Sequence, residues 1–278
     1  CDGVAASFTD GSSIVTGTFT SAWDFDDTNT STLTSPSNTY ATIGSYDVKQ
    51  VLTSDQGCKD SITKTVVIHP NPVADFTTAN VCDGVAASFT DGSSIATGTF
   101  TSLWDFDDGR SSTLRSPGNT YAAIGSYDVN LSLTSNFGCT DAVTKSVTIY
   151  PNPIADFTIA NECEGIEVSP DNLTTGADTY AWNFGDGNIS TQKDPTHIFA
   201  RNRNYTVTLV ATSVEGCTNQ AVRQIIIYNS PLVSTSKDAE IGKGLPINIS
   251  ASGGLDYEWS QSIWLDDAFA ATTTARPD

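Results

Sequence analysis

The segment Gly-Ser-Tyr-Asp-Val-Asn-Leu-Ser-Leu-Thr-Ser, residues 125–135, decides the fold class of this 278-residue chain. From Tyr127 to Leu133, apolar residues alternate with polar ones, and this period of two is typical of a strand with one buried face. A second alternating run covers residues 143–149, and the turn between the two runs contains Gly138. The two runs are therefore predicted to form a β-hairpin, with no helical periodicity around them.

The hairpin belongs to a repeat. Cys1, Cys82 and Cys163 are 81 residues apart, and residues 1–72 match residues 82–153 at 53 of 72 positions. A period near 80 residues is too long for a solenoid unit, so each copy is expected to have its own core. About seven short strands per copy predict an immunoglobulin-like β-sandwich, and the whole chain an all-β, elongated rod of tandem domains. The predicted domains are residues 1–71, which lack a first strand, residues 72–152, residues 153–229, and the first part of a further immunoglobulin-like domain at residues 230–278.

The charge of the chain excludes several partners. The 32 acidic and 13 basic residues give a net charge of −19, which repels a nucleic-acid backbone. No apolar run approaches the length of about 18 residues that a membrane helix needs, so no membrane insertion is predicted in this segment. The chain has no methionine and does not open with a signal sequence, so we expect an internal segment of a longer protein.

Each copy carries aromatic residues at fixed positions. A Trp-x-Phe pattern on one face of a strand predicts a sandwich core, and a Tyr at the head of an alternating strand predicts a tyrosine corner. The predicted core residues are Trp23, Phe25, Trp104, Phe106, Trp182 and Phe184, and the predicted corner residues are Tyr46, Tyr127 and Tyr205.

These aromatic motifs carry a family resemblance. Trp-Asp-Phe-Asp-Asp at residues 23–27 and 104–108, and Trp-Asn-Phe-Gly-Asp-Gly at residues 182–187, resemble the W-D-F-G-D-G hallmark of PKD domains. Pro-Thr-His-Ile-Phe at residues 195–199 is similar to that family's P-T-H-x-Y. The resemblance covers nearly all of residues 1–229, although Asp26 and Asp107 stand where the family usually has Gly. PKD arrays with a Cys pair in each copy resemble large surface proteins of bacteria with type IX secretion, including gliding adhesins, and the resemblance implies a secreted cell-surface protein with a role in cell adhesion.

The six cysteines recur with the repeat. The pairing that treats every copy alike joins Cys1 to Cys58, Cys82 to Cys139 and Cys163 to Cys217, so each domain is expected to close with its own disulfide. Long-lived disulfides indicate an oxidising, extracellular location. The chain contains no Cys-x-x-Cys motif, which argues against zinc.

Clustered aspartates offer a possible calcium site. Three carboxylates within four residues can supply oxygen ligands, and some PKD-like domains bind calcium. The alternative, which we favour, is that these side chains accept hydrogen bonds from backbone N–H groups of the turn, so no cofactor is predicted. The candidate residues for the calcium alternative are Asp24, Asp26, Asp27, Asp105, Asp107 and Asp108.

Catalytic chemistry is not expected. The only two histidines, His69 and His197, lie in different copies, and no nucleophile-elbow, zinc-protease or phosphate-loop motif is present. We predict a non-catalytic stalk or adhesive segment that spaces or presents a distal binding region and meets a protein or glycan surface ligand. The alternatives are accessory substrate- or calcium-binding modules of a secreted hydrolase, and a surface filament that self-associates through exposed strand edges.

Overall fold

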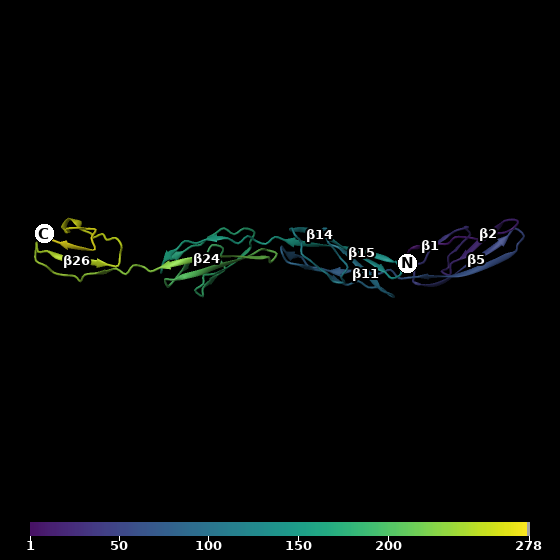
Figure 1. Cartoon of the computed structure of the whole chain (residues 1–278), viewed down its shortest axis with the longest axis horizontal. Helices are drawn as coiled ribbons and strands as arrows, with labels where there is room; N and C mark the ends of the chain where they lie inside the picture. Colours follow the sequence, from purple (N-terminus) through teal and green to yellow (C-terminus); the bar gives the residue numbers. More distant parts are fainter. Residues whose placement is uncertain (277–278) are drawn as a thin grey trace. The chain divides into compact units, whose positions relative to one another are not determined.

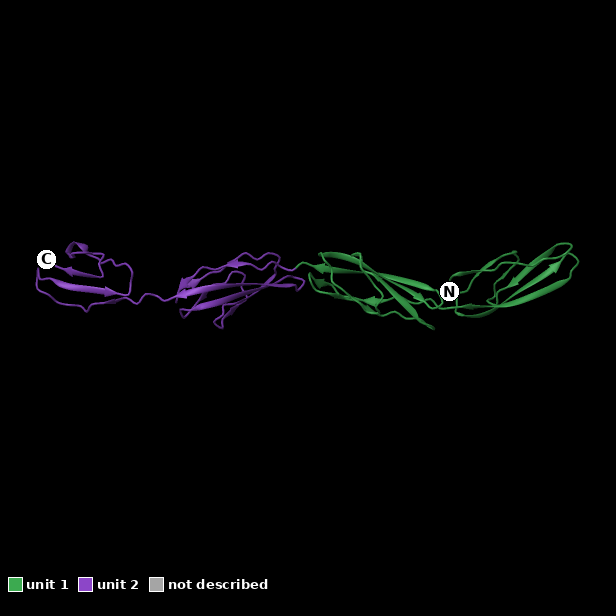
Figure 2. Cartoon of the chain, viewed as in Figure 1, with its two compact units in different colours: residues 1–151 green, residues 152–278 purple. Residues whose placement is uncertain are grey.

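A computed structural model describes residues 1–276, and within that range the regular structure consists of strands and one short 3₁₀ helix (Figure 1). The chain forms two compact units, residues 1–151 and 152–278 (Figure 2). Unit 1 contains two sandwiches, module 1 and module 2, and unit 2 begins with a third, module 3. The prediction of an all-β chain of immunoglobulin-like sandwiches is confirmed, whereas the rod shape stays a prediction.

Module 2 is a complete sandwich. One sheet has the order β12-β11-β14-β15-β8, and the opposite layer consists of the pairs β10-β7 and β13-β9. The long hairpin β14-β15 runs in register from Gly125↔Ile149 to Thr134↔Thr140, as the alternating sequence predicts. Its strands are β7 (Phe76–Thr77), β8 (Val81–Cys82), β9 (Ala87–Ser88), β10 (Thr90–Asp91), β11 (Phe100–Asp105), β12 (Ser111–Ser112), β13 (Gly118–Asn119), β14 (Gly125–Ser135) and β15 (Thr140–Tyr150).

Module 3 repeats this architecture. Its main sheet has the order β17-β24-β23-β20-β21, faced by the pairs β16-β19 and β18-β22. The strands are β16 (Phe157–Thr158), β17 (Glu162–Cys163), β18 (Glu167–Val168), β19 (Asp171–Asn172), β20 (Thr179–Asn183), β21 (Ile189–Ser190), β22 (His197–Ile198), β23 (Asn204–Thr212) and β24 (Thr218–Tyr228). After module 3, the sheet β25-β26-β27 and the 3₁₀ helix η1 complete unit 2, with β25 (Ser234–Thr235), β26 (Ile247–Ser252), η1 (Ser262–Trp264) and β27 (Thr272–Ala275).

Module 1 has fewer strands. Its main sheet has the order β3-β2-β5-β6, and the opposite layer is the single pair β1-β4. Among the residues that the structure describes, nothing in module 1 corresponds to β7 or β8 of module 2. The strands are β1 (Ala5–Ser7), β2 (Phe19–Asp24), β3 (Thr30–Ser31), β4 (Ser37–Thr39), β5 (Gly44–Ser54) and β6 (Lys59–Ile68).

Candidate functional site: the junction of modules 1 and 2

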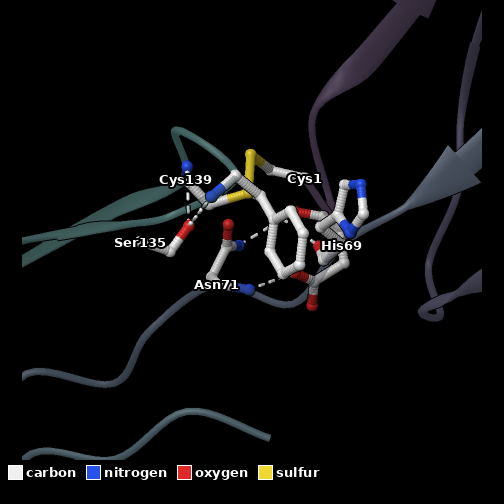
Figure 3. Close-up of a disulfide and its surroundings, with 7 residues drawn as sticks. Cys1, His69, Asn71, Ser135 and Cys139 are labelled. Atoms are coloured by element: carbon white, nitrogen blue, oxygen red, sulfur yellow. Dashed lines mark hydrogen bonds between the residues drawn. A yellow bond between two sulfur atoms is a disulfide. The ribbon is translucent and has the colours of Figure 1, made fainter. Parts of the chain in front are cut away.

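A disulfide between Cys1 and Cys139 joins module 1 to module 2 (Figure 3). Its two Cα atoms are 5.6 Å apart, although 138 residues separate them in the sequence. Cys139 lies in the turn between β14 and β15, where its backbone N–H donates to Ser135 Oγ at 3.0 Å. The Ser135 N–H donates in return to the carbonyl oxygen of Cys139 at 2.8 Å, so the turn holds the sulfur in place. The bond therefore connects two separately packed cores.

This bond corrects the predicted disulfide pattern. Cys139 binds Cys1 rather than Cys82, and Cys58 and Cys163 are free, so none of the three intradomain pairs forms. Cys82 and Cys217 are each disulfide-bonded.

The length of the sandwich explains the error. In module 2, Cys82 pairs in register with Tyr150 at the end of β15, whereas Cys139 directly precedes that strand. Eleven residues of strand separate the two positions, and at about 3.3 Å per residue the gap is roughly 35 Å, far beyond the separation of about 7 Å that a disulfide tolerates. Module 3 has the same arrangement, because Cys163 pairs in register with Tyr228 at the end of β24.

Contacts between rings and backbone surround the bond. The His69 ring stacks on the Phe137 ring, with centroids 3.8 Å apart and planes within 5° of parallel. The connector that follows β6 is tied to the start of module 1, because the Asn71 N–H donates to Asp2 Oδ1 at 2.8 Å and its side-chain amide donates to the Asp2 carbonyl at 2.9 Å. The sequence analysis did not predict these contacts. The repeated x-Pro-Asn-Pro connector, which contains Asn71, is the sequence feature that could have indicated them.

The predicted aromatic residues lie in equivalent places in all three modules. The Trp side chains of β2, β11 and β20 are buried, and each indole N–H donates to a backbone carbonyl ten residues onward. Each corner tyrosine donates its hydroxyl to the carbonyl four residues earlier at 2.9 Å. The Trp and Phe residues are Trp23, Phe25, Trp104, Phe106, Trp182 and Phe184, and the tyrosines are Tyr46, Tyr127 and Tyr205.

The clustered aspartates accept hydrogen bonds within their turns. In module 2, Asp105 Oδ1 accepts from the Asp107 N–H at 3.1 Å, and Asp107 Oδ2 accepts from the N–H of Asp128 on β14 at 3.1 Å. Asp108 holds the other side of the turn through the Arg110 N–H and the Asn119 side chain, at 2.9 and 2.8 Å. In module 1, Asp24, Asp26 and Asp27 make the corresponding bonds. Most of these oxygens therefore already serve the turn.

Module 3 closes the same turn with a partly buried polar pair that the sequence analysis missed. His197 Nε2 lies 2.7 Å from Asp186 Oδ2, and the imidazole stacks on Phe184 with centroids 4.2 Å apart. Burial would raise the pKa of the Asp186 carboxyl, but hydrogen bonds from Asn188 and His197 outweigh that effect and lower it. The pair links the turn to β22.

Over residues 1–276, no group of three or more His, Cys, Asp or Glu side chains has a metal-binding arrangement. In the same range, no helix is both long and apolar enough to cross a membrane.

The family model for the PKD domain matches the chain three times, at residues 1–70, 69–151 and 150–227. The chain belongs to the PKD domain family. PKD domains are non-catalytic immunoglobulin-like modules, and some relatives are parts of enzymes.

One curated relative of these PKD modules is collagenase ColA from Bacillus cereus, which is 35% identical over 77 residues. That match covers 28% of this chain and 8% of the collagenase, so the chain corresponds to a small part of that enzyme. Two solved structures are also similar: the PKD1 domain of Vibrio anguillarum Epp and the PKD1 domain of the Vibrio cholerae metalloprotease PrtV. Their identities are 31% and 29%, they match 28% and 27% of this chain over 96% of their own length, and their TM-scores are 0.26 and 0.25.

The position where the PKD hallmark has glycine is left-handed in every module. Gly185 has a φ of 78°, and Asp26 and Asp107 adopt 62° and 61° in the equivalent turns. A Cβ on Gly185 would lie 2.5 Å from the carbonyl oxygen of Thr206, so only glycine fits in module 3. In modules 1 and 2 the aspartate carboxylate instead accepts a hydrogen bond from the neighbouring strand, which compensates for the strained φ.

Proposed function

We propose that this PKD array is a non-catalytic structural segment of an extracellular cell-surface protein, in which covalent bonds between modules carry load. The observation that supports the proposal is the Cys1–Cys139 disulfide, which links two modules rather than closing one. Disulfides of this kind persist in oxidising compartments, which favours an extracellular location. The net charge of −19 suits an exposed, soluble surface.

The bond changes the route that force takes along the chain. Residues 2–138 lie inside a covalent loop, so a pull that enters at Cys1 passes through the two sulfur atoms into the turn before β15. Module 1 is then bypassed rather than stretched. A segment that spaces or presents a distal binding region needs this resistance to extension, because an unfolded module would lengthen the stalk and expose its core.

Single-molecule stretching tests this proposal. Handles are attached to the α-amino group of residue 1 and to position 151 of the full chain, so that the pulled span contains both modules. Releasing the 138-residue loop in a Cys1→Ser variant is expected to add roughly 470 Å of extensible length, at about 3.4 Å per residue. The proposal fails if the unmodified chain already extends by that amount under non-reducing conditions.

The surface ligand is part of the proposal. We place the segment in a bacterial adhesin of the type IX-secreted class, where it would meet a protein or glycan. A glycan array and a cell-adhesion assay with the purified chain test this part, and the absence of any adhesion would leave only the spacer role.

An accessory role in a secreted hydrolase is the second candidate. The 35% identity to a segment of collagenase ColA favours it. Co-sedimentation of the chain with insoluble collagen tests this role, and retention in the pellet would favour it over the stalk. Calcium-dependent binding is tested in the same experiment by adding a chelator to a parallel sample.

A further inference from the structure

The three modules carry their cysteines at equivalent positions. Each has an early cysteine, which is Cys1, Cys82 or Cys163, and a turn cysteine, which is Cys58, Cys139 or Cys217. The Cys58 N–H donates to Ser54 Oγ at 3.1 Å, and the Ser54 N–H donates back to the Cys58 carbonyl oxygen at 2.9 Å. The same two bonds between Cys139 and Ser135 are 3.0 and 2.8 Å long. The turns of modules 1 and 2 therefore hold their cysteines alike.

The turn cysteines differ in what covers them. Cys139 is 1% exposed and is bonded to Cys1, whereas Cys58 is exposed and free. In module 3 the turn cysteine Cys217, whose N–H donates to Ser213 Oγ at 3.2 Å, is again disulfide-bonded and 1% exposed. The same position is thus one end of a disulfide in two of the three modules. An exposed thiol left over in an oxidising compartment indicates a partner in another module or another chain.

The bond at Cys139 shows which kind of partner such a turn takes. The Asp2 N–H donates to the carbonyl oxygen of His69 at 3.0 Å, which places Cys1 beside the connector that leads into module 2. The partner of the turn is therefore the early cysteine of the preceding PKD module, 138 residues earlier in the sequence. A cysteine in the same relation to Cys58 lies 138 residues before it and belongs to a module ahead of Cys1.

The cysteines of residues 1–278 do not fit this role. Cys58 directly precedes β6, and Cys1 lies at the far end of that strand, next to His69. Ten residues of strand, at about 3.3 Å each, separate them by roughly 33 Å, far beyond the reach of a disulfide. The free Cys163 is an early cysteine of a later module, whereas the pattern requires one from a preceding module. The remaining three are already disulfide-bonded: Cys82, Cys139 and Cys217.

We propose that Cys58 is the attachment point for a preceding PKD module, whose early cysteine forms a disulfide with it. The bond between Cys1 and Cys139 then recurs one module earlier in the longer protein. This inference rests on the proposed role of covalent bonds between modules and extends it to a further junction. Residues 2–57 lie inside both covalent loops, so they stay shielded from tension when either one of the two bonds is broken.

The bond forms by thiol–disulfide exchange. The thiolate of Cys58 attacks a small-molecule disulfide such as oxidised glutathione, which releases one equivalent of the small thiolate. The thiolate of the early cysteine then attacks the Cys58 sulfur of the mixed disulfide and releases the second equivalent. Two protein thiols are thereby oxidised, one small disulfide is reduced to two thiols, and the protons lost by the cysteines are taken up by the released thiolates.

A chain with one added module tests the proposal. A copy of residues 72–162 is placed directly ahead of Cys1, so that a complete module, its connector and a first strand precede module 1. The early and turn cysteines of the added module are the copies of Cys82 and Cys139. The extended chain is folded in a mixture of oxidised and reduced glutathione, alkylated without reduction under denaturing conditions, and mapped by mass spectrometry.

Cys58 is expected to change from alkylated to protected. In the chain of residues 1–278 it should be alkylated, whereas in the extended chain it should form a disulfide with the copy of Cys82. The copy of Cys139 should then be the alkylated turn cysteine. Replacing the copy of Cys82 with serine should return Cys58 to the alkylated form. An alkylated Cys58 in the extended chain overturns the proposal, and so does a bond from Cys58 to any other cysteine.

A second measurement separates attachment within one chain from a link between two copies. The chain of residues 1–278, kept in the same glutathione mixture, should migrate as a monomer on a non-reducing gel. A disulfide-linked dimer that Cys58→Ser abolishes would overturn the proposal in favour of a link between copies. The stretching test between residue 1 and position 151 does not involve Cys58, so failure here would leave the proposed load-bearing role of the bond between Cys1 and Cys139 intact.

Discussion

Removing the bond between the two modules is the sharpest test of the junction. In a Cys1→Ser variant the junction disulfide is lost, while the buried Cys139 keeps its place in the turn before β15. In the chain-entropy treatment, closing a loop of 138 residues stabilises the folded state by about 5 kcal/mol. If module 1 alone unfolds while module 2 stays folded, the closed loop is shorter, about 70 residues, and the contribution is still about 4 kcal/mol.

Hydrogen exchange followed by mass spectrometry measures this effect for each module separately. A loss of about 4 kcal/mol corresponds to exchange that is roughly a thousandfold faster. The expected change is in β5 and β6 of module 1, with little change in module 3. Cys58→Ser is the matched control, because Cys58 is an exposed free thiol and its replacement should leave exchange unaltered. Unchanged exchange in Cys1→Ser would refute the reasoning. Equally faster exchange in Cys58→Ser and in Cys1→Ser would instead indicate the intradomain bond between Cys1 and Cys58.

Three further outcomes are expected. Alkylation of the unreduced, denatured chain should modify two of its six cysteines, Cys58 and Cys163, and peptide mapping that finds either one in a disulfide contradicts the pattern. Gly185→Ala should destabilise module 3 by about 2 kcal/mol or more in urea unfolding, because the new Cβ clashes with the backbone of Thr206. Asp107→Gly should destabilise module 2 by less. Equal losses of stability would be inconsistent with the close approach of Gly185 to the Thr206 backbone. The pKa of Asp186 is lower in the folded state than its ordinary value of 3.8, so its stabilising effect is complete above that pH and is lost as the pH falls below it. Asp186→Asn should therefore flatten the decline of the urea midpoint as the pH falls below 3.8, and an unchanged slope would count against the link between the turn and β22.

Most of the fold could be predicted from local pattern. The alternation from Tyr127 to Leu133 fixed which face of β14 is buried, and the repeat placed the same hairpin in each module. The recurring Trp-x-Phe pattern located the cores because one large aromatic residue at a constant strand position has to be buried on the inner face.

The disulfide pattern could not be predicted from the repeat alone. Pairing within each copy and pairing between adjacent copies both respect the repeat, so its symmetry does not distinguish them. The strand length does distinguish them: the turn cysteine and the early cysteine of one module lie at opposite ends of an eleven-residue strand such as β15.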